Sequence, residues 1–159
     1  MTPLQRHRAM AHNRGRTGPE RALALGLWRR GIRYFTHEGY KSATGERLSG
    51  NPDMVFPRKR IVIFIDGCFW HGCPRCRKHK GLRGQFWVGK ITANRERDLR
   101  VTRELTDAGW TVLRIPEHDV RTKTALADTI DRLVPLIHAA SPDKVTFGVG
   151  ENGVHAAGP

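Results

Sequence analysis

The chain has 159 residues, enough for one domain with a hydrophobic core of its own. Lys and Arg outnumber Asp and Glu by 28 to 15, which gives a formal net charge of +13 and indicates a polyanionic partner, nucleic acid first and an acidic membrane second. Hydrophobic residues make up 38% of the chain, so an intrinsically disordered chain is excluded. Charge does not choose a chemistry, because a ribosomal protein would show the same excess.

Two features of the sequence indicate the compartment. No segment approaches the roughly 18 apolar residues of a membrane span, and the basic N-terminus is not followed by the apolar run of a secretory signal. We therefore expect a protein of the reducing cytoplasm. There, three cysteines within nine positions, Cys68, Cys73 and Cys76, favour metal or redox chemistry over a disulfide.

The apolar pattern predicts a series of helices and strands after a basic arm at residues 1–16. In chain order these are a helix at 17–31, strands at 32–35, 53–56 and 61–65, a helix at 90–108, a strand at 110–115 and a helix at 124–139. Residues 61–65 are the most apolar run, which predicts a central strand covered on both faces.

The helices have further sequence signals. Thr17 as N-cap, with Pro19 in the first turn and Glu20 at the capping-box position, marks the start of the first helix. Inward positions are predicted by spacing at Ile91, Leu99 and Leu105 in the second helix, and at Leu126, Ile130, Leu133 and Ile137 in the last. Pro135 is expected to kink or shorten that last helix.

The element order predicts the fold class. Helix, three strands, helix, strand and helix indicate an α/β fold with a mixed β-sheet flanked by helices. We expect one domain at 17–140, the basic arm at 1–16 before it and a flexible tail rich in Gly and Pro at 141–159.

Cysteine spacing predicts a zinc site. Cys68-x4-Cys73-x2-Cys76 supplies three thiolates from one loop, and the CxxC pair lets two sulfurs meet one ion. A fourth ligand has to come from elsewhere. His118, just beyond the strand at 110–115, is one candidate, and His71 and His79 are nearer competitors. Buried or redox-active cysteines are the alternative, but they do not account for the clustering in a hydrophilic loop.

Two aspartates end or begin strands. Asp53 heads one strand and Asp66 ends the next, so adjacent strands would place both carboxylates on one side of a sheet, where they suit Mg²⁺. Taken alone the pattern is weak, because Pro-Asp and Asp-Gly pairs are common at turns. His71 is a candidate general base, although a lone histidine is more often a metal ligand or a satisfied polar group. The capping box by itself accounts for a glutamate at position 20, without any catalytic role.

Four aromatic residues, Phe69, Trp70, Phe86 and Trp87, fall among basic residues. Such side chains wedge between base pairs or stack on exposed bases. The alternative is that they cover the zinc site. We favour the wedge interpretation.

Several motifs together resemble the very short patch repair (Vsr) DNA mismatch endonucleases. The resemblance runs from about Arg8 to the end of the last predicted helix, and its most specific part is Gly67-Cys68-Phe69-Trp70-His71. The other motifs are Pro52-Asp53-x-Val55-Phe56, Ile63-Phe64-Ile65-Asp66, Gly72-Cys73-Pro74, Trp87-x-x-Lys90-Ile91-x-x-Asn94-x-x-Arg97-Asp98, Gly109-Trp110-Thr111-Val112-Leu113 and Glu117.

The resemblance implies a restriction-endonuclease-like fold of the PD-(D/E)xK type with a structural zinc loop. It implies Mg²⁺ at Asp53 and at the backbone carbonyl of Ile65, with water activated by His71. Glu20 would support the hydrated metal, and Asp66 stands at an active-site position often held by His. The other implied roles are zinc binding by Cys68, Cys73, Cys76 and His118, intercalation by Phe69, Trp70 and Trp87, and contacts with DNA by Lys90 and Asn94.

The sequence departs from the family pattern at three places. Pro116 stands where the family usually has Trp, Gly18 replaces the Lys of a Thr-Lys-Pro-Glu motif, and Cys68 occupies the lysine position of D/E-x-K. Asp66 in place of His adds negative charge near the metal.

The function predicted from all of this is Mg²⁺-dependent nicking of double-stranded DNA, 5′ of the T of a T:G mismatch. The enzyme would be a bacterial cytoplasmic monomer acting on nucleoid DNA, helped by the basic arm with Arg14 and Arg16. Two alternatives stay open: a related nickase of unmismatched or modified DNA, and a zinc-stapled DNA-binding module without catalysis.

Overall fold

The computed structural model describes residues 17–42, 45–71, 73, 75–76, 85–140 and 155–156. Its elements are the helices α2 (Gly18–Arg29), α3 (Gln85–Asp107) and α4 (Lys123–Ala139), the strands β1 (Met54–Phe56), β2 (Ile61–Asp66), β3 (Thr111–Pro116) and β4 (His155–Ala156), and the 3-10 turns η1 (Pro57–Lys59) and η2 (Glu117–Val120). The basic arm, with Arg14 and Arg16, lies outside the described residues, as do His79 and most of the predicted tail.

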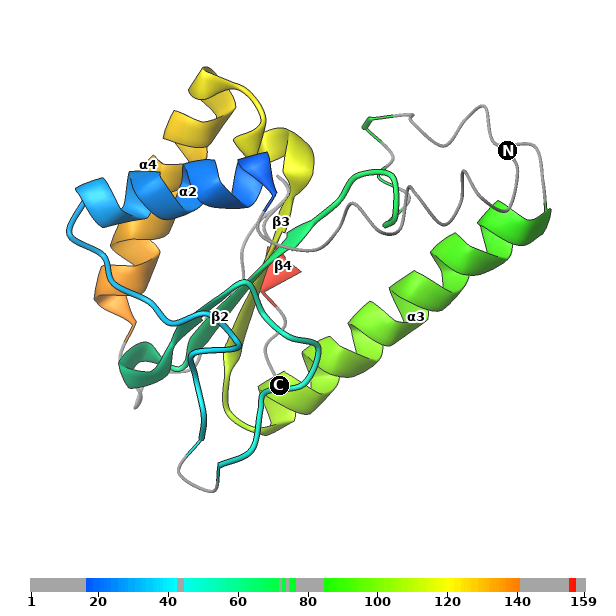
Figure 1. Ribbon diagram of the computed structural model, residues 1–159, viewed down its shortest axis with the longest axis horizontal. Helices are drawn as coiled ribbons and strands as arrows, with labels where there is room; N and C mark the ends of the chain where they lie inside the picture. Colours follow the sequence, from blue (N-terminus) through cyan, green and yellow to red (C-terminus); the bar gives the residue numbers. More distant parts are fainter. Residues whose placement is uncertain are drawn as a thin grey trace.

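A mixed four-stranded sheet in the order β1-β2-β3-β4 forms the centre of the molecule. β1 runs antiparallel to β2, β2 runs parallel to β3, and β3 pairs antiparallel with the two residues of β4. In Figure 1, α2 and α4 lie together on one side of the sheet and the long α3 lies on the other. The predicted α/β class, a mixed sheet flanked by helices, is confirmed.

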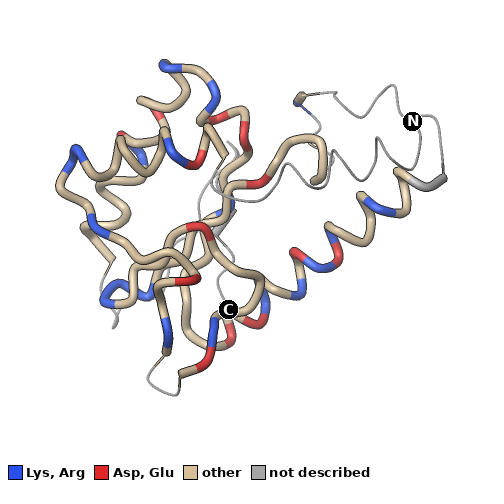
Figure 2. Tube along the Cα trace, viewed as in Figure 1, with Lys and Arg blue, Asp and Glu red and all other residues tan. Residues whose placement is uncertain are grey.

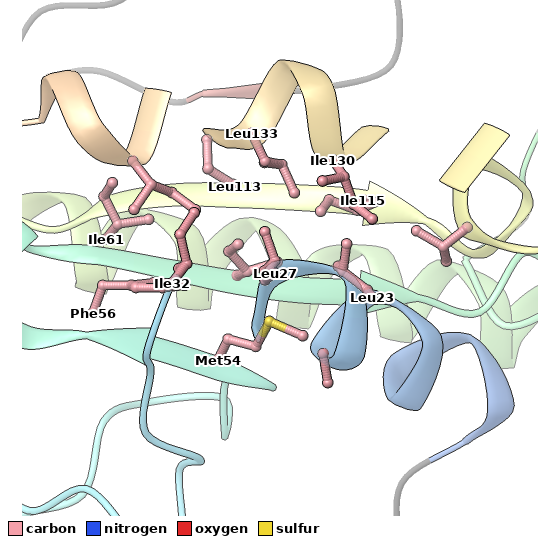
Figure 3. Close-up of a cluster of buried hydrophobic side chains, with 14 residues drawn as sticks. Leu23, Leu27, Ile32, Met54, Phe56, Ile61, Leu113, Ile115, Ile130 and Leu133 are labelled. Carbon is pink, nitrogen blue, oxygen red and sulfur yellow. The ribbon is translucent and has the colours of Figure 1, made fainter. Parts of the chain in front are cut away.

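A hydrophobic core fills each side of the sheet. Figure 3 shows the larger one, in which Leu23 and Leu27 of α2 and Ile130 and Leu133 of α4 meet Met54, Ile61 and Ile115 of the strands. The other lies under α3, where Val101, Leu105 and Trp110 pack against Val55, Val62, Phe64 and Val112. The strand at 61–66 is covered by both cores, as its unbroken apolar sequence predicted.

Helix α2 begins as the sequence predicted. The Thr17 side chain accepts a hydrogen bond from the Glu20 backbone N–H, and Glu20 accepts one from the Thr17 backbone N–H, which completes the capping box. Gly26 lets α2 approach α4 closely, since a Cβ at this position would lie 2.1 Å from Cδ1 of Ile130. Pro135 is accommodated inside α4, which continues to Ala139.

Three expectations are wrong in detail. Residues 32–35 form no strand; only Phe35 makes an isolated antiparallel bridge, to Val55, so two strands rather than three precede α3. Helix α3 begins at Gln85, five residues earlier than predicted. Leu99 is 61% exposed, because the inward stripe of α3 passes through Asp98 and Val101 instead.

Charged residues are spread over the helices on both sides of the sheet, as Figure 2 shows. No described helix has the length and apolar character needed to cross a bilayer.

Candidate active site and metal centre

The backbone before β1 fixes Asp53. Gly50 and Asn51 both adopt a positive φ, 74° and 55°, and a Cβ on Gly50 would lie 2.4 Å from Cγ1 of Val101. Glycine is therefore required where the loop passes α3. The Asp53 backbone N–H then donates to the Ile63 carbonyl, and Oδ2 of Asp53 accepts a 2.7 Å hydrogen bond from the Ile65 backbone N–H. These bonds hold the carboxylate beside the end of β2.

A hollow of about 160 Å³ opens at this point, between the end of β2 and α3. Four residues predicted for the site line it together: Asp53, Ile65, Asp66 and His71. The sequence brings them there because β1 and β2 pair antiparallel, so the start of β1 lies beside the end of β2. The remaining lining comes from Gly50, Asn51, Phe64, Arg97, Asp98, Val101 and Arg114.

His71 is oriented by a carboxylate that no residue-based prediction used. Nδ1 of His71 lies 2.5 Å from Oδ2 of Asp98, and Nε2 lies 3.8 Å from Oδ1 of Asp66. Burial acts to raise the pKa of Asp98, but the hydrogen bond from His71 and the charge of Arg114 outweigh it and hold that pKa below its usual value. Asp98 therefore stays ionised at neutral pH and keeps its hydrogen bond on the Nδ1 side of the imidazole.

Arg114 joins the two carboxylates that flank His71. Its Nε and Nη2 atoms lie 2.8 and 2.9 Å from the two carboxylate oxygens of Asp66, and Nη2 lies 2.9 Å from Oδ1 of Asp98. Burial would lower the pKa of Arg114, but the bonds and charges of Asp66 and Asp98 outweigh it and raise that pKa. The guanidinium is thus a permanent cation under the hollow.

Glu20 lines a second hollow, of about 400 Å³, next to the first. Ile65 belongs to the lining of both hollows, and Gly67, Trp70 and Glu117 line the second with Glu20. The Glu20 carboxylate also accepts from the Thr17 backbone N–H at 3.2 Å and lies 2.7 Å from the Thr17 hydroxyl. The two hollows therefore meet at Ile65, and Glu20 belongs to the lining of the second.

Three cysteines and one histidine form a cluster with the chemistry of a metal centre. One ligand atom from each of Cys68, Cys73, Cys76 and His118 lies within 4.8 Å of all the others. Nδ1 of His118 faces the three sulfurs, at 3.3 Å from Cys68, 3.5 Å from Cys73 and 3.3 Å from Cys76. Three thiolates and one imidazole in this arrangement are a donor set that zinc accepts.

The competitors for the fourth position are placed elsewhere or not described. His71 points its Nδ1 to Asp98, and His79 lies outside the described residues. Burial raises the pKa of the Cys68 thiol to about 12, while in Cys73 hydrogen bonds with Cys76 and Arg75 outweigh burial and lower the pKa. A bound cation would favour all three thiolates, since metal ligation requires deprotonated sulfur.

The loop that begins at Cys68 is joined to η2 beside this cluster. The Glu117 carboxylate accepts a 3.3 Å hydrogen bond from the Cys68 backbone N–H and forms an ion pair with Arg121. Nε2 of His118 lies 3.2 Å from Oδ1 of Asp119, on the side away from the sulfurs. Asp119 is thus an ion-pair neighbour of the imidazole, but Nε2 of His118 is buried and has no aligned hydrogen-bond partner among the described residues.

Three aromatic rings gather beside the hollows. Trp87 lies in the first turn of α3 and meets Phe69 and Trp70 of the cysteine loop, with ring centroids 4.9 to 6.1 Å apart. The Asn94 side chain donates to the Trp70 carbonyl at 3.1 Å, which ties the loop to α3. Lys90 lies on the same helix and is partly buried, and the side chain of Phe86 is outside the described residues.

Comparison with known proteins identifies the family. The family model "DNA mismatch endonuclease Vsr" matches residues 1–78. The chain is 38% identical to the Type II nicking enzyme V.NaeI of Lentzea aerocolonigenes over 80% of this chain and 75% of that protein. It is 36% identical to the Type II nicking enzyme V.NmeDIP of Neisseria meningitidis serogroup C, over 84% and 88%. The DNA mismatch endonuclease Vsr of Escherichia coli is 42% identical over 51% and 53%.

The chain belongs to the Vsr family of DNA endonucleases. Its substrate is DNA, and the Vsr relatives include enzymes named for nicking and one named for mismatches. A zinc-stapled binding module without catalysis is therefore set aside. The fold and the cysteine–histidine cluster agree with a Vsr endonuclease.

Two residues of the Vsr site were missed by reasoning from residue types. Asp98 carries a detectable signal, because it continues the inward stripe of Val101 and Leu105 as a charged residue and is therefore expected to face a partner. Arg114 has a similar signal as the one basic residue in the apolar strand at 111–116. Neither signal says which carboxylate the residue meets.

Proposed function

We propose that this Vsr endonuclease nicks one strand of double-stranded DNA 5′ of the T in a T:G mismatch, with Mg²⁺ as cofactor. The observation that carries the proposal is the convergence of Asp53, Ile65 and His71 in one hollow, with Asp98 holding His71 in a single orientation. T:G pairs arise where 5-methylcytosine is deaminated. Cutting on the T side would direct repair to the damaged strand.

The active-site residues have different chemical roles. Asp53 and the Ile65 carbonyl are oxygen donors of the kind that Mg²⁺ prefers. Glu20 lines the neighbouring hollow together with Ile65, and we assign it the role of holding metal-bound water through hydrogen bonds. When bound, Mg²⁺ polarises the scissile phosphate and lowers the pKa of a coordinated water. Nε2 of His71 takes the proton of the attacking water, and the in-line displacement leaves a 5′-phosphate and a 3′-hydroxyl.

We propose zinc as the ion of the Cys68, Cys73, Cys76 and His118 cluster, with a structural role. Four protein ligands complete a tetrahedral shell and leave no open position for chemistry. The ion would fix the loop that carries Phe69, Trp70 and His71, since these three residues lie between the first two cysteine ligands.

The T:G specificity rests on the aromatic cluster. Phe69, Trp70 and Trp87 stand beside the hollows in edge and tilted arrangements, so they offer ring surfaces to a distorted base step. Arg14, Arg16, Lys90 and Asn94 would add contacts to the DNA. Both proposed metal centres and the aromatic cluster lie on one chain, which supports a monomer. We place this monomer on nucleoid DNA in the bacterial cytoplasm.

A strand-resolved cleavage assay tests the proposal. Two duplexes that differ only by one T:G pair are labelled on each strand and incubated with Mg²⁺ and the wild-type enzyme or Asp53→Ala. We expect a nick only 5′ of the mismatched T, absent with Asp53→Ala. Full Mg²⁺-dependent nicking by Asp53→Ala would refute the metal assignment.

A nickase with another target is the second candidate, favoured by the names of the relatives that match over the greater length, which are Type II nicking enzymes. The same assay separates the two, because such an enzyme would cut the matched duplex, or a modified one, as readily as the mismatched duplex.

Replacing Trp70 by alanine tests the wedge. Stacking of a base on an aromatic ring contributes about 1–3 kcal/mol, so we expect roughly 5–150-fold weaker binding to the T:G duplex in Trp70→Ala. Trp28→Ala is the matched control, because Trp28 is on α2, is 55% exposed and has Arg33 stacked over its ring. Binding is measured by fluorescence anisotropy with Ca²⁺ in place of Mg²⁺. An equal loss on the matched duplex would argue against mismatch reading by this ring.

A further inference from the structure

Three carboxylates line the hollow that contains His71: Asp53, Asp66 and Asp98. Such a set commonly holds two divalent cations about 4 Å apart. Here, however, a guanidinium lies among them. Asp66 and Asp98 are each in contact with Arg114, and the three side chains are only 14 to 18% exposed.

We propose that Arg114 is a positioning residue that occupies Asp66 and Asp98 as ion-pair partners, so that this site takes one divalent cation, at Asp53, and not two. The inference rests on the proposed function, which assigns the metal to Asp53. It adds the number of metal ions and the residue that sets this number.

The geometry of the Asp66 pair opposes metal binding. Both oxygens of Asp66 face nitrogens of Arg114, at 2.8 and 2.9 Å, which is the two-point pairing of a guanidinium with a carboxylate. A cation bound at Asp66 would compete with this pairing for the negative charge of the carboxylate. It would also lie next to a permanent positive charge in a poorly solvated place, where repulsion between like charges is strong.

Arg114 itself is not available to the DNA phosphate. Besides the carboxylates, its Nη1 lies 3.4 Å from the Thr102 hydroxyl, and its guanidinium packs over the Phe64 ring at 4.8 Å. Phe64 and Arg114 are register partners on β2 and β3, so the strands hold this stack in place. The same guanidinium fixes Asp98, which in turn binds Nδ1 of His71.

Counting bound Mn²⁺ by electron paramagnetic resonance tests the inference without relying on turnover. Mn²⁺ substitutes for Mg²⁺, and the full zinc-loaded chain is titrated with and without duplex DNA. We expect about one Mn²⁺ per chain, lost in Asp53→Ala and kept in Asp66→Asn. Arg114→Met should gain a second Mn²⁺, which the double variant Asp66→Asn with Arg114→Met should lose again.

Arg30→Met is the matched control, because Arg30 forms an ion pair with Asp131 on the surface, and its count should stay at about one. Arg114→Lys keeps the positive charge and should also stay at about one. Two ions in the wild type with one lost in Asp66→Asn would overturn the inference, as would a folded Arg114→Met with an unchanged count. If Arg114→Met does not fold, Asp66→Asn decides by itself. Retention of Mn²⁺ in Asp53→Ala is a separate result, which would count against the proposed function.

Discussion

Replacing His71 by alanine should lower the rate of nicking by about 10²–10⁴-fold and leave DNA affinity nearly unchanged, since general-base catalysis contributes about this factor. The structure supplies the physical reason. Asp98 occupies Nδ1 of the imidazole at 2.5 Å, so Nε2 is the nitrogen left to face the hollow beside Asp53. Single-turnover nicking of a labelled duplex measures the rate, and anisotropy with Ca²⁺ measures the affinity.

Substitution of Asp98, which is bonded to Nδ1 of His71, should also lower the nicking rate. Asp98→Asn removes the negative charge that orients the ring and stabilises its protonated form, so the nicking rate should fall with little change in DNA affinity. Glu96→Gln makes the same chemical change on the exposed side of α3 and should behave as wild type. If Asp98→Asn nicks at the wild-type rate, Asp98 does not position the base. If His71→Ala does so, His71 is not the base.

The part of the site that could be predicted from the sequence depends on local pattern. Asp53 and Asp66 stand at the ends of short apolar runs, and neighbouring antiparallel strands bring such ends together whatever the rest of the fold does. Three cysteines in one loop likewise need only the chain between them. The fourth ligand, His118, was left open by spacing, because a parallel pairing of β2 with β3 is what carries it to the loop.

Arg114 and Asp98 show what local pattern cannot give. Arg114 reaches Asp66 only because the register sets Phe64 beside Arg114 and Asp66 beside Pro116, and a shift of one residue would turn Arg114 to the other face of the sheet. Asp98 meets His71 and Arg114 because α3 packs across the face of the sheet to which Arg114 points. The error at Leu99 has the same origin, since a rotation of about 100° per residue separates the two positions on the helix.

Loss of the third cysteine ligand should be the second large effect: Cys76→Ser should release the bound metal and lower the melting temperature. Binding of structural zinc contributes up to about 10–16 kcal/mol in small domains. Losing even about 3 kcal/mol of it would lower Tm by roughly 6–12 °C in a domain of this size. The cluster joins the cysteine loop to η2 through His118, so the ion closes a connection between two distant parts of the chain.

The same substitution should reach the active site and the wedge. Phe69, Trp70 and His71 lie between Cys68 and Cys73, so a released loop leaves the aromatic rings and the base without a fixed position. Metal content by inductively coupled plasma mass spectrometry, Tm by differential scanning calorimetry and nicking rate are measured on one preparation. His138→Ala, at an exposed position of α4, is the control and should keep all three values. A Cys76→Ser protein with full zinc content and unchanged Tm would show that this cluster does not hold the structural ion, and the cysteines would then have to be explained by redox chemistry.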